Sequence, residues 1–136
     1  MTDAGVVWER LRELVHETYD RRKEVSDALG MSFAKAKALR RIAAGPLTMR
    51  ELAEQLVTDP PYATLLVDDL ERRGLVERNV HPRDRRRKIV EITEAGREAV
   101  KTADRILGEP PPALQALPES DLAALAAILA KIGGAR

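Results

Sequence analysis

One stretch in the middle of the chain constrains the fold more than any other feature of the sequence. In LTMRELAEQL, Thr48 stands three residues before Glu51, a capping box that predicts the start of a short helix. TDPPYATLLVDDLERRG follows, with Thr58 or Asp59 as the N-cap and Pro60 at the first helical position. Two short helices joined by a tight turn predict a helix-turn-helix unit.

Two strands are predicted directly after this unit. LVERN begins with Leu75 and Val76, and KIVEI carries Ile89, Val90 and Ile92, so both segments have the apolar character of short strands. The loop between them closes a β-hairpin, and a β-hairpin attached to a helix-turn-helix is a wing. A wing beside a recognition helix can reach the phosphates and the minor groove that flank the major groove.

The loop of the predicted wing is strongly basic. Arg72 to Lys88 contains eight basic and two acidic residues, a net charge of +6 in a chain whose formal net charge is only +1. The rest of the chain therefore carries −5. A positive patch on an acidic body favours an anionic partner, although a solvated face or a disordered arm is the alternative on charge alone.

Helices are predicted on both sides of the winged unit. Apolar residues at three- and four-residue steps predict one amphipathic helix over 7–29, ended by Gly30, and a second helix over 32–44. After the wing, Thr93 caps a helix over 94–107, GEPPPAL interrupts it, and a last helix covers 118–132. Its apolar stripe comprises Leu122, Leu125, Leu129 and Ile132.

These terminal helices need a partner for their apolar stripes. A winged helix of about 60 residues can cover little extra surface, so the first and last helices are expected to pack together, within one subunit or between two. The sequence thus predicts a mainly α protein with a small β-hairpin wing. Its predicted parts are an N-terminal dimerisation helix (1–30), a winged helix-turn-helix domain (31–93) and C-terminal dimerisation helices (94–136).

Several classes of function lack the residues that they need. The chain has no cysteine, which excludes disulfides and thiolate chemistry, and its histidines, His16 and His81, are too far apart to suggest a metal site. It carries no G-x-S-x-G, P-loop or H-E-x-x-H motif, so neither an enzyme nor a cofactor is predicted. No apolar run has the length of a signal peptide or membrane span, and we expect a cytoplasmic protein without membrane contact.

The segment ELAEQL…LLVDDLERRGLVERNVHPRDRRRKIVEITEAG resembles the multiple antibiotic resistance regulator (MarR) family of bacterial transcription factors. The wing signature D-x-R-x-x-x-[LV]-x-[LI]-T is matched by Asp84, Arg86, Val90, Ile92 and Thr93. The element L-E-x-x-G-L-[VI]-x-R is matched by Leu70, Glu71, Gly74, Leu75, Val76 and Arg78. The resemblance implies a homodimer that binds pseudopalindromic double-stranded DNA and represses nearby genes until a small molecule releases it.

The resemblance also places the recognition helix at about residues 59–73. Its DNA-facing positions would be Pro61, Tyr62, Thr64 and Leu65. These residues depart from the commoner family pattern of small polar residues with a basic side chain, although they are compatible with thymine methyl contacts. Base specificity is therefore expected to depend more on the wing and on DNA shape, and helix packing is the open alternative for Leu65. Asp68 and Asp69 suit a DNA-binding helix only if they face solvent or orient an arginine.

The wing supplies most of the other predicted contacts. Arg85 and Arg86 are the candidates for the minor groove, and Arg83, Arg87 and Lys88 for phosphates. Asp84 is repelled by phosphate and is expected to have a structural role, with Arg86 as a possible partner. Thr48 and Arg50, at the start of the first helix of the motif, are expected to contact the DNA backbone.

An effector site is implied by the resemblance alone. In relatives, phenolic or other lipophilic anions bind between the dimerisation helices and the winged helix. Here that region would be lined by Trp8, His16, Tyr19, Met31 and Phe33. Ordinary core packing is the alternative for the aromatic residues and Met31, and a surface position for His16.

Two other functions stay open at this point. A winged helix can bind a protein instead of DNA, but such a module has no need of the basic run from Arg85 to Lys88. RNA binding is disfavoured because no exposed aromatic platform accompanies the basic residues. The operator, the regulated genes and the direction of regulation are not encoded in any pattern of the sequence.

Overall fold

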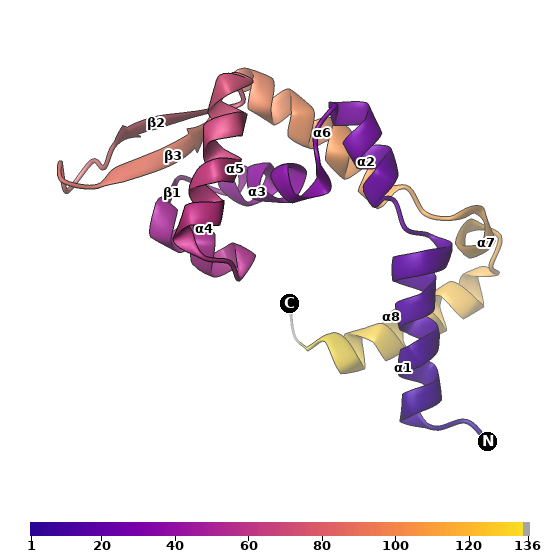
Figure 1. Ribbon diagram of the computed structural model, residues 1–136. Coiled ribbons are helices and arrows are strands. Elements are labelled where there is room, and N and C mark those ends of the chain that lie inside the picture. Colours follow the sequence, from indigo (N-terminus) through magenta and orange to yellow (C-terminus); the bar gives the residue numbers. More distant parts are fainter. Residues whose placement is uncertain (135–136) are drawn as a thin grey trace.

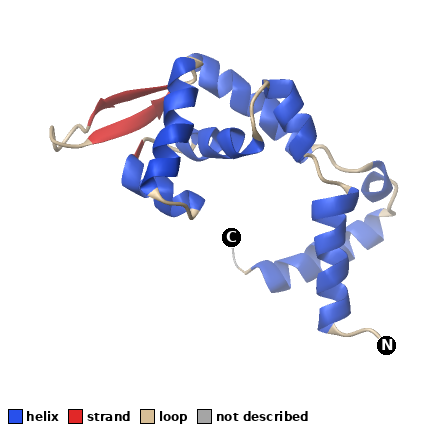
Figure 2. Cartoon of the chain, in the orientation of Figure 1, coloured by secondary structure: helices blue, strands red, loops and turns tan. Residues whose placement is uncertain are grey.

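The computed structural model describes residues 1–134 as a helical protein with one small sheet (Figures 1 and 2). The helices are α1 (Ala4–Glu13), η1 (Leu14–Thr18, a π-helical turn), α2 (Arg22–Leu29), α3 (Phe33–Ala43), α4 (Met49–Leu56), α5 (Pro60–Arg72), α6 (Glu94–Gly108), α7 (Pro112–Gln115) and α8 (Glu119–Gly133). The strands are β1 (Leu47–Thr48), β2 (Val76–Val80) and β3 (Lys88–Ile92). The predicted winged helix-turn-helix fold is confirmed, whereas a role of the terminal helices in dimerisation stays a prediction.

The two helices of the helix-turn-helix unit begin where their caps predict. The Glu51 amide donates to Thr48 Oγ1 at 3.1 Å and the Thr48 amide donates to Glu51 Oε1 at 2.9 Å, completing the capping box of α4. Asp59 Oδ1 accepts from the Tyr62 amide at 2.8 Å, so Asp59 is the N-cap of α5. The predicted inner face of α5 is buried, and it comprises Ala63, Leu66, Val67 and Leu70.

The sheet has one strand more than the predicted hairpin. Its order is β1-β3-β2, and all its strands pair antiparallel, with Leu47 opposite Val90 and Thr48 opposite Ile89. The prediction of Thr48 as the cap of a helix is confirmed, but the pairing of Leu47 and Thr48 with β3 was not predicted. A strand of two residues has no hydrophobic period of its own, so only its pairing with β3 reveals it.

The first turn of α6 lies directly against the sheet. Thr93 Oγ1 donates to the Gly74 carbonyl at 2.7 Å and accepts from the Gly96 amide at 3.1 Å. A Cβ atom at Gly96 would lie 2.1 Å from the Leu75 carbonyl oxygen and 2.6 Å from Ile92 Cγ1. The glycine therefore permits a close approach that no other residue allows without movement.

The single N-terminal helix predicted over 7–29 is wrong, because the chain breaks between η1 and α2. The Tyr19 amide donates to the Leu14 carbonyl at 2.9 Å, which widens the last turn. Asp20 Oδ1 then accepts from the Arg22 amide at 2.9 Å, and its carboxylate also pairs with the Arg22 guanidinium. These hydrogen bonds, the side-chain one foremost, lower the pKa of Asp20 to about 2 and offer the backbone an alternative to helix.

The C-terminal segment contains a short helix that the prediction missed. The prolines of GEPPPAL were expected only to interrupt the chain, but Pro112 occupies the first position of α7, where a proline loses no helix hydrogen bond. The long helices α6 and α8 agree with their predicted positions to within about one residue. Residues 135 and 136, included in the predicted segment 94–136, lie outside the described residues.

The core lies in the winged helix-turn-helix and in α2 and α6, which pack on it. It is formed by α2, α3, α4, α5, the sheet and α6, and its largest fully buried side chains are Leu39, Ile42, Leu52, Leu70, Val25, Val67, Val76 and Val90. α1, η1 and α8 contain no buried residue in the described part of the chain. Figure 1 shows α1, α7 and α8 at the end of the molecule opposite the wing. Within residues 1–134, none of the helices combines the length and the apolar character of a membrane span.

Candidate nucleic-acid interface

The first two turns of α5, the predicted recognition helix, present an uncharged, largely apolar surface to solvent. Pro61, Tyr62, Thr64 and Leu65 are all exposed, with Tyr62 at 44% and Leu65 at 65% of their full accessible area. Leu65 is therefore outside the buried core of this chain. The Thr64 hydroxyl donates to the Pro60 carbonyl at 3.0 Å, so its hydrogen is used inside the helix.

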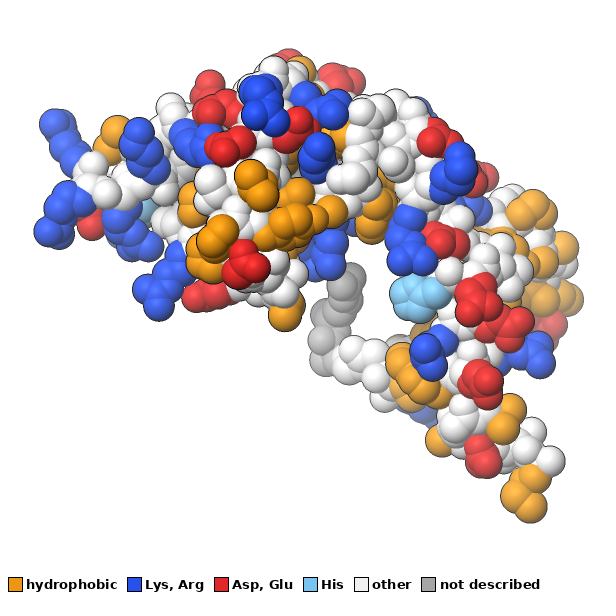
Figure 3. All heavy atoms as spheres, viewed as in Figure 1, with side chains coloured by type: hydrophobic (Ala, Val, Ile, Leu, Met, Phe, Trp, Pro, Cys, Tyr) orange, Lys and Arg blue, Asp and Glu red, His pale blue; other side chains and the backbone are white. Residues whose placement is uncertain are grey.

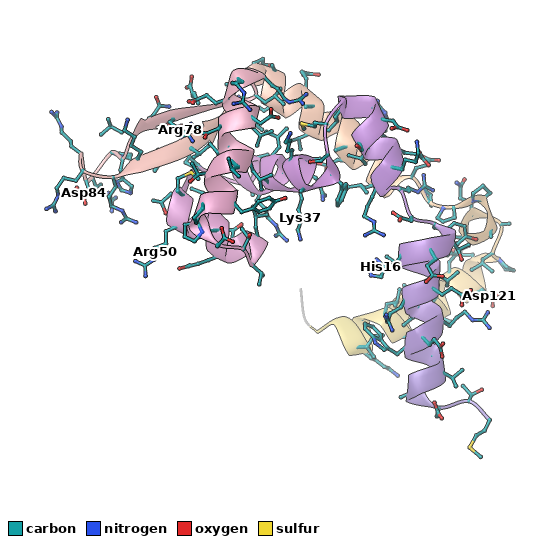
Figure 4. The ribbon with its side chains drawn as sticks, viewed as in Figure 1. His16, Lys37, Arg50, Arg78, Asp84 and Asp121 are labelled. Atoms are coloured by element: carbon teal, nitrogen blue, oxygen red, sulfur yellow. The ribbon has the colours of Figure 1, made fainter. Side chains whose placement is uncertain are left out.

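The start of α4 offers one exposed cation. Arg50 has 85% of its side-chain area exposed and lies 3.6 Å from the Glu54 carboxylate, an exposed pair that holds it weakly (Figure 4). Thr48, predicted to contact the DNA backbone, is only 6% exposed, and its side chain is occupied by the capping box. Thr48 thus shapes the start of α4, and Arg50 is the side chain that reaches solvent there.

The tip of the wing is held by its own hydrogen bonds. The His81 amide donates to the Arg87 carbonyl at 2.9 Å, and the Arg87 amide donates to the Asp84 carbonyl at 3.0 Å. Asp84 Oδ1 accepts from the Arg86 amide at 3.0 Å and lies 3.4 Å from Arg86 Nε. The carboxylate of Asp84 therefore organises the turn that carries the arginines, while the Arg86 side chain stays 92% exposed.

His81 is a wing residue that the sequence analysis did not assign. Its Nδ1 accepts a hydrogen bond from the Arg83 amide at 3.0 Å, directly before the basic turn. The signal available in the sequence was the dipeptide His81-Pro82 at the entrance of a turn.

The positive charge of the wing is unpaired, in contrast to that of the neighbouring helix. Among residues 1–134, no ion pair is formed by four of its basic side chains, namely Arg83, Arg85, Arg87 and Lys88. Figure 3 shows Lys and Arg side chains gathered at the wing tip, and hydrophobic side chains exposed over α4 and α5 in the same view. Four unpaired cations and Arg86 thus stand beside the recognition helix.

The basic residues at the end of α5 are instead paired with an acid of the fold. Asp69 pairs with Arg73 at 2.6 Å and Arg72 at 3.1 Å, and also with Lys35 of α3 at 3.1 Å. These hydrogen bonds, that of Arg73 foremost, hold the pKa of the Asp69 carboxyl well below its ordinary value. Asp69 therefore orients arginines, one of the two roles, with facing solvent, that were expected for an acid in a DNA-binding helix.

Arg78 links the recognition helix to the wing. Its guanidinium pairs with Asp68 and with Glu71 Oε1, so β2 is tied to the outer face of α5 (Figure 4). The Arg78 amide also donates to Glu71 Oε2 at 3.3 Å. This bridge fixes the wing relative to the recognition helix, and because its members are up to ten residues apart in the sequence, charge pattern alone did not reveal it.

The five predicted effector residues do not meet in one cavity. Trp8 is 63% exposed on α1, Met31 is 5% exposed in the core, and Phe33 lines a surface hollow of about 610 Å³ between α3 and α6. His16 lies in a separate shallow depression along α1 and η1, well apart from Lys37 on α3 (Figure 4). Tyr19 is half-buried at the break between η1 and α2.

The hollow beside Phe33 is partly basic. Its lining includes Lys37, Arg40 and Arg41, and Arg40 Nε donates to Asp104 Oδ1 at 2.8 Å across its rim. Within the described residues no group of three or more histidine, cysteine or acidic side chains has an arrangement that would hold a metal ion.

Comparison with known proteins agrees with this architecture. A sequence profile of the MarR family matches residues 29–87, which span the winged helix-turn-helix up to the wing tip. The uncharacterized HTH-type transcriptional regulator YcgE of Bacillus subtilis (strain 168) is 38% identical over 66 residues, 48% of this chain and 43% of YcgE. The matched segment thus spans less than half of that relative.

Solved structures extend the likeness to nearly the whole chain. The reduced form of MarR from E. coli has a TM-score of 0.73 and 27% identity, with 97% of each chain covered. A mutant of S. aureus MepR bound to an oligodeoxyribonucleotide has a TM-score of 0.67 and 22% identity, covering 97% of this chain and 96% of its own, and shares the fold. The profile match covers the helix-turn-helix and wing, and the likeness to MarR covers nearly the whole chain, so this chain is similar to the MarR family and has its winged helix-turn-helix fold.

Proposed function

We propose that the protein is a sequence-specific DNA-binding regulator of transcription that acts as a homodimer. The observation that carries this proposal is the wing, where Arg83, Arg85, Arg87 and Lys88 lack acidic partners among residues 1–134, whereas the nearby Arg72, Arg73 and Arg78 each pair with an acid. Phosphate contacts supply the sequence-independent part of DNA affinity and require unpaired cations. The oligodeoxyribonucleotide bound to the MepR relative supports the same ligand for this fold.

The homodimer is supported by the exposed apolar surfaces of the terminal helices. Val6, Val7, Trp8, Leu14 and Val15 are exposed on α1 and η1, and Leu122, Ile128, Leu129 and Ile132 on α8. Large side chains in such number on helices without a buried residue favour a protein interface. A two-fold dimer would present two recognition helices to half-sites about one turn of DNA apart, which fits a pseudopalindromic operator.

Repression of nearby genes and release by a small anion are the finer part of the proposal. They rest on the similarity to the MarR family and on the hollow beside Phe33, whose rim carries Lys37 and Arg41. A phenolic or other lipophilic anion has both an apolar body for Phe33 and Val100 and a charge for these cations. A panel of aromatic carboxylates added to the protein–DNA complex tests this part, because an effector lowers the affinity in proportion to its occupancy.

The principal experiment measures DNA binding over a salt series. Fluorescence anisotropy of a labelled duplex from upstream of the gene, with an unrelated duplex as control, should show saturable binding at two subunits per site. Arg86→Ala should weaken binding to both duplexes and reduce the slope of log K against log salt by about 1. Equal affinity for the two duplexes would contradict specific binding of the protein to the DNA upstream of its own gene.

A matched arginine variant separates wing contacts from general charge loss. Arg40→Ala removes the same charge from α3, where Arg40 is paired with Asp104 at 2.8 Å, so its salt slope should equal that of the wild type. Equal slopes for Arg86→Ala and the wild type, with folding intact, would show that the wing does not contact phosphate. Sedimentation over a range of protein concentrations tests the dimer independently.

A further inference from the structure

We propose that α5 recognises its DNA site through the 5-methyl groups of thymine, contacted by Leu65 and the ring of Tyr62. The inference deepens the proposed function and rests on it. It assigns specificity to apolar contacts instead of the paired hydrogen bonds to base edges that most DNA readers use. The predicted half-site is accordingly rich in thymine at the positions below the first two turns of α5.

The first argument is the chemistry that these turns lack. PPYATLLV, residues 60–67, contains no arginine, lysine, asparagine, glutamine, aspartate or glutamate. Those are the side chains that form paired or charge-assisted hydrogen bonds with guanine, adenine and cytosine in the major groove. The first charged residues of the helix already have partners within the chain, since Asp68 pairs with Arg78 and Asp69 pairs with Arg73.

The second argument is the exposure of large apolar side chains there. Tyr62 and Leu65 are three residues apart on the helix, so they lie next to each other on one face, 44% and 65% exposed. The wing that carries the four unpaired cations extends from α5, which contacts its strand β2 (Figure 1), and these cations favour a polyanion as the molecule that covers this face. Thymine is the natural DNA base that presents a methyl group in the major groove.

The third argument concerns Thr64. Its hydroxyl hydrogen is donated to the Pro60 carbonyl at 3.0 Å, which leaves its methyl group as a further apolar contact. The Tyr62 hydroxyl is then the one side-chain donor that residues 60–67 keep free for a base or a phosphate. A surface of this kind distinguishes a methyl group from a hydrogen atom but does not distinguish guanine from adenine by hydrogen bonding.

The test removes the methyl groups from the DNA and nothing else. The protein is first used to enrich bound duplexes from a pool whose random segment holds two half-sites about 10 base pairs apart. In the enriched duplex, thymines of the half-sites are then replaced by deoxyuridine, which pairs identically but lacks the methyl group. Burial of one methyl group corresponds to about a fourfold change in affinity, so replacing each contacted thymine should lower the affinity about fourfold.

Three controls make the result specific to this helix face. Deoxyuridine placed outside the half-sites should leave the affinity unchanged, because only α5 contacts the methyl groups. Leu65→Ala, at a residue that is 65% exposed, should reduce the difference in affinity between the thymine and deoxyuridine duplexes, because only the Tyr62 ring is left to contact methyl groups. Arg86→Ala should bind both duplexes more weakly while keeping the ratio of their affinities, since Arg86 lies on the wing and the thymine methyl groups lie in the major groove.

The outcomes distinguish this inference from the function on which it rests. Enrichment of a specific duplex that binds equally well with deoxyuridine would overturn methyl recognition and leave DNA binding intact. Absence of any enriched duplex, together with weak binding to all DNA, would overturn the proposed function and this inference with it. The deoxyuridine comparison uses the unaltered protein, so it holds even if Leu65→Ala is poorly folded.

Discussion

The winged helix and the terminal helices use apolar residues in opposite ways. α3 buries four of its 11 residues, Ala36, Ala38, Leu39 and Ile42, whereas α8, with 15 residues and a comparable apolar content, buries none. The difference arises because α2, α5, α6 and the sheet all pack against α3. An apolar stripe becomes a core only where another element faces it, so the winged helix is stabilised within the chain and α8 requires a surface from outside it.

The same substitution in the two regions should have very different effects. Leu39 is fully buried, so Leu39→Ala should lower the free energy of unfolding by about 2–5 kcal/mol at any protein concentration. Leu129 is 44% exposed, so Leu129→Ala should change the stability of the single chain by only about 0.5 kcal/mol. In a dimer covered at α8, the effect of Leu129→Ala should instead depend on protein concentration.

Urea unfolding of Leu39→Ala and Leu129→Ala at two protein concentrations measures these changes in unfolding free energy. Equal, concentration-independent losses for Leu39→Ala and Leu129→Ala would break the comparison, because they would mean that α8 is packed within the chain. If only the effect of Leu129→Ala depended on protein concentration, the result would support the contrast between the buried core and α8.

Gly96 tests how tightly the connecting helix α6 belongs to the winged helix. A Cβ atom there would meet the Leu75 carbonyl oxygen at 2.1 Å, so Gly96→Ala should destabilise the protein by about 1–3 kcal/mol. The control is Gly108→Ala at the other end of the same helix, where a Cβ atom meets nothing within 4 Å. Thermal unfolding should show a lower Tm for the first variant and an unchanged or slightly higher Tm for the second.

Asp69 makes the winged helix sensitive to acid. Its cationic partners lower the pKa of the folded-state carboxyl below its ordinary value near 4. The stabilisation is therefore present above about pH 4 and is lost as the pH falls further and the carboxyl is protonated. Asp69→Asn should reduce stability at neutral pH and flatten its decline in acid.

Acid titration of the unfolding free energy by circular dichroism measures this slope. Asp27→Asn is the control, because Asp27 has one exposed partner, Lys23, with the two side chains 66% and 87% exposed. An acid slope for Asp69→Asn identical to that of the wild type would show that the cluster does not stabilise the fold.

The smallest expected effect is at the turn between α4 and α5, and it has the opposite sign. Val57 has φ +52°, a left-handed conformation that is unfavourable for a β-branched residue, and its side chain is 91% exposed. Val57→Asn should raise stability by about 0.5–1 kcal/mol, because asparagine tolerates this conformation and no packing is lost. Val57→Ala should give a smaller gain by the same thermal assay, and a loss in both variants would indicate that Val57 contributes packing in the folded protein.

Local signals in the sequence predicted most of the winged helix. The capping box at Thr48, the cap at Asp59 and the apolar spacing of α5 each depend on residues within one or two turns, so they could be interpreted without the rest of the chain. The same spacing misled at the N-terminus, where the period continues past Tyr19 but the helix does not. There the Asp20 carboxylate competes for the backbone, and no core supports a continuous helix.

The sequence by itself determined the family resemblance, the order of the elements and the presence of excess positive charge near the wing. Only the tertiary structure decided which of those charges are available. Lys35 reaches Asp69, and Arg78 reaches Asp68, across separations that no local pattern encodes, and these pairs leave the wing cations as the unpaired ones. Charge is carried by individual residues, whereas its neutralisation depends on distances that exist only in the folded chain.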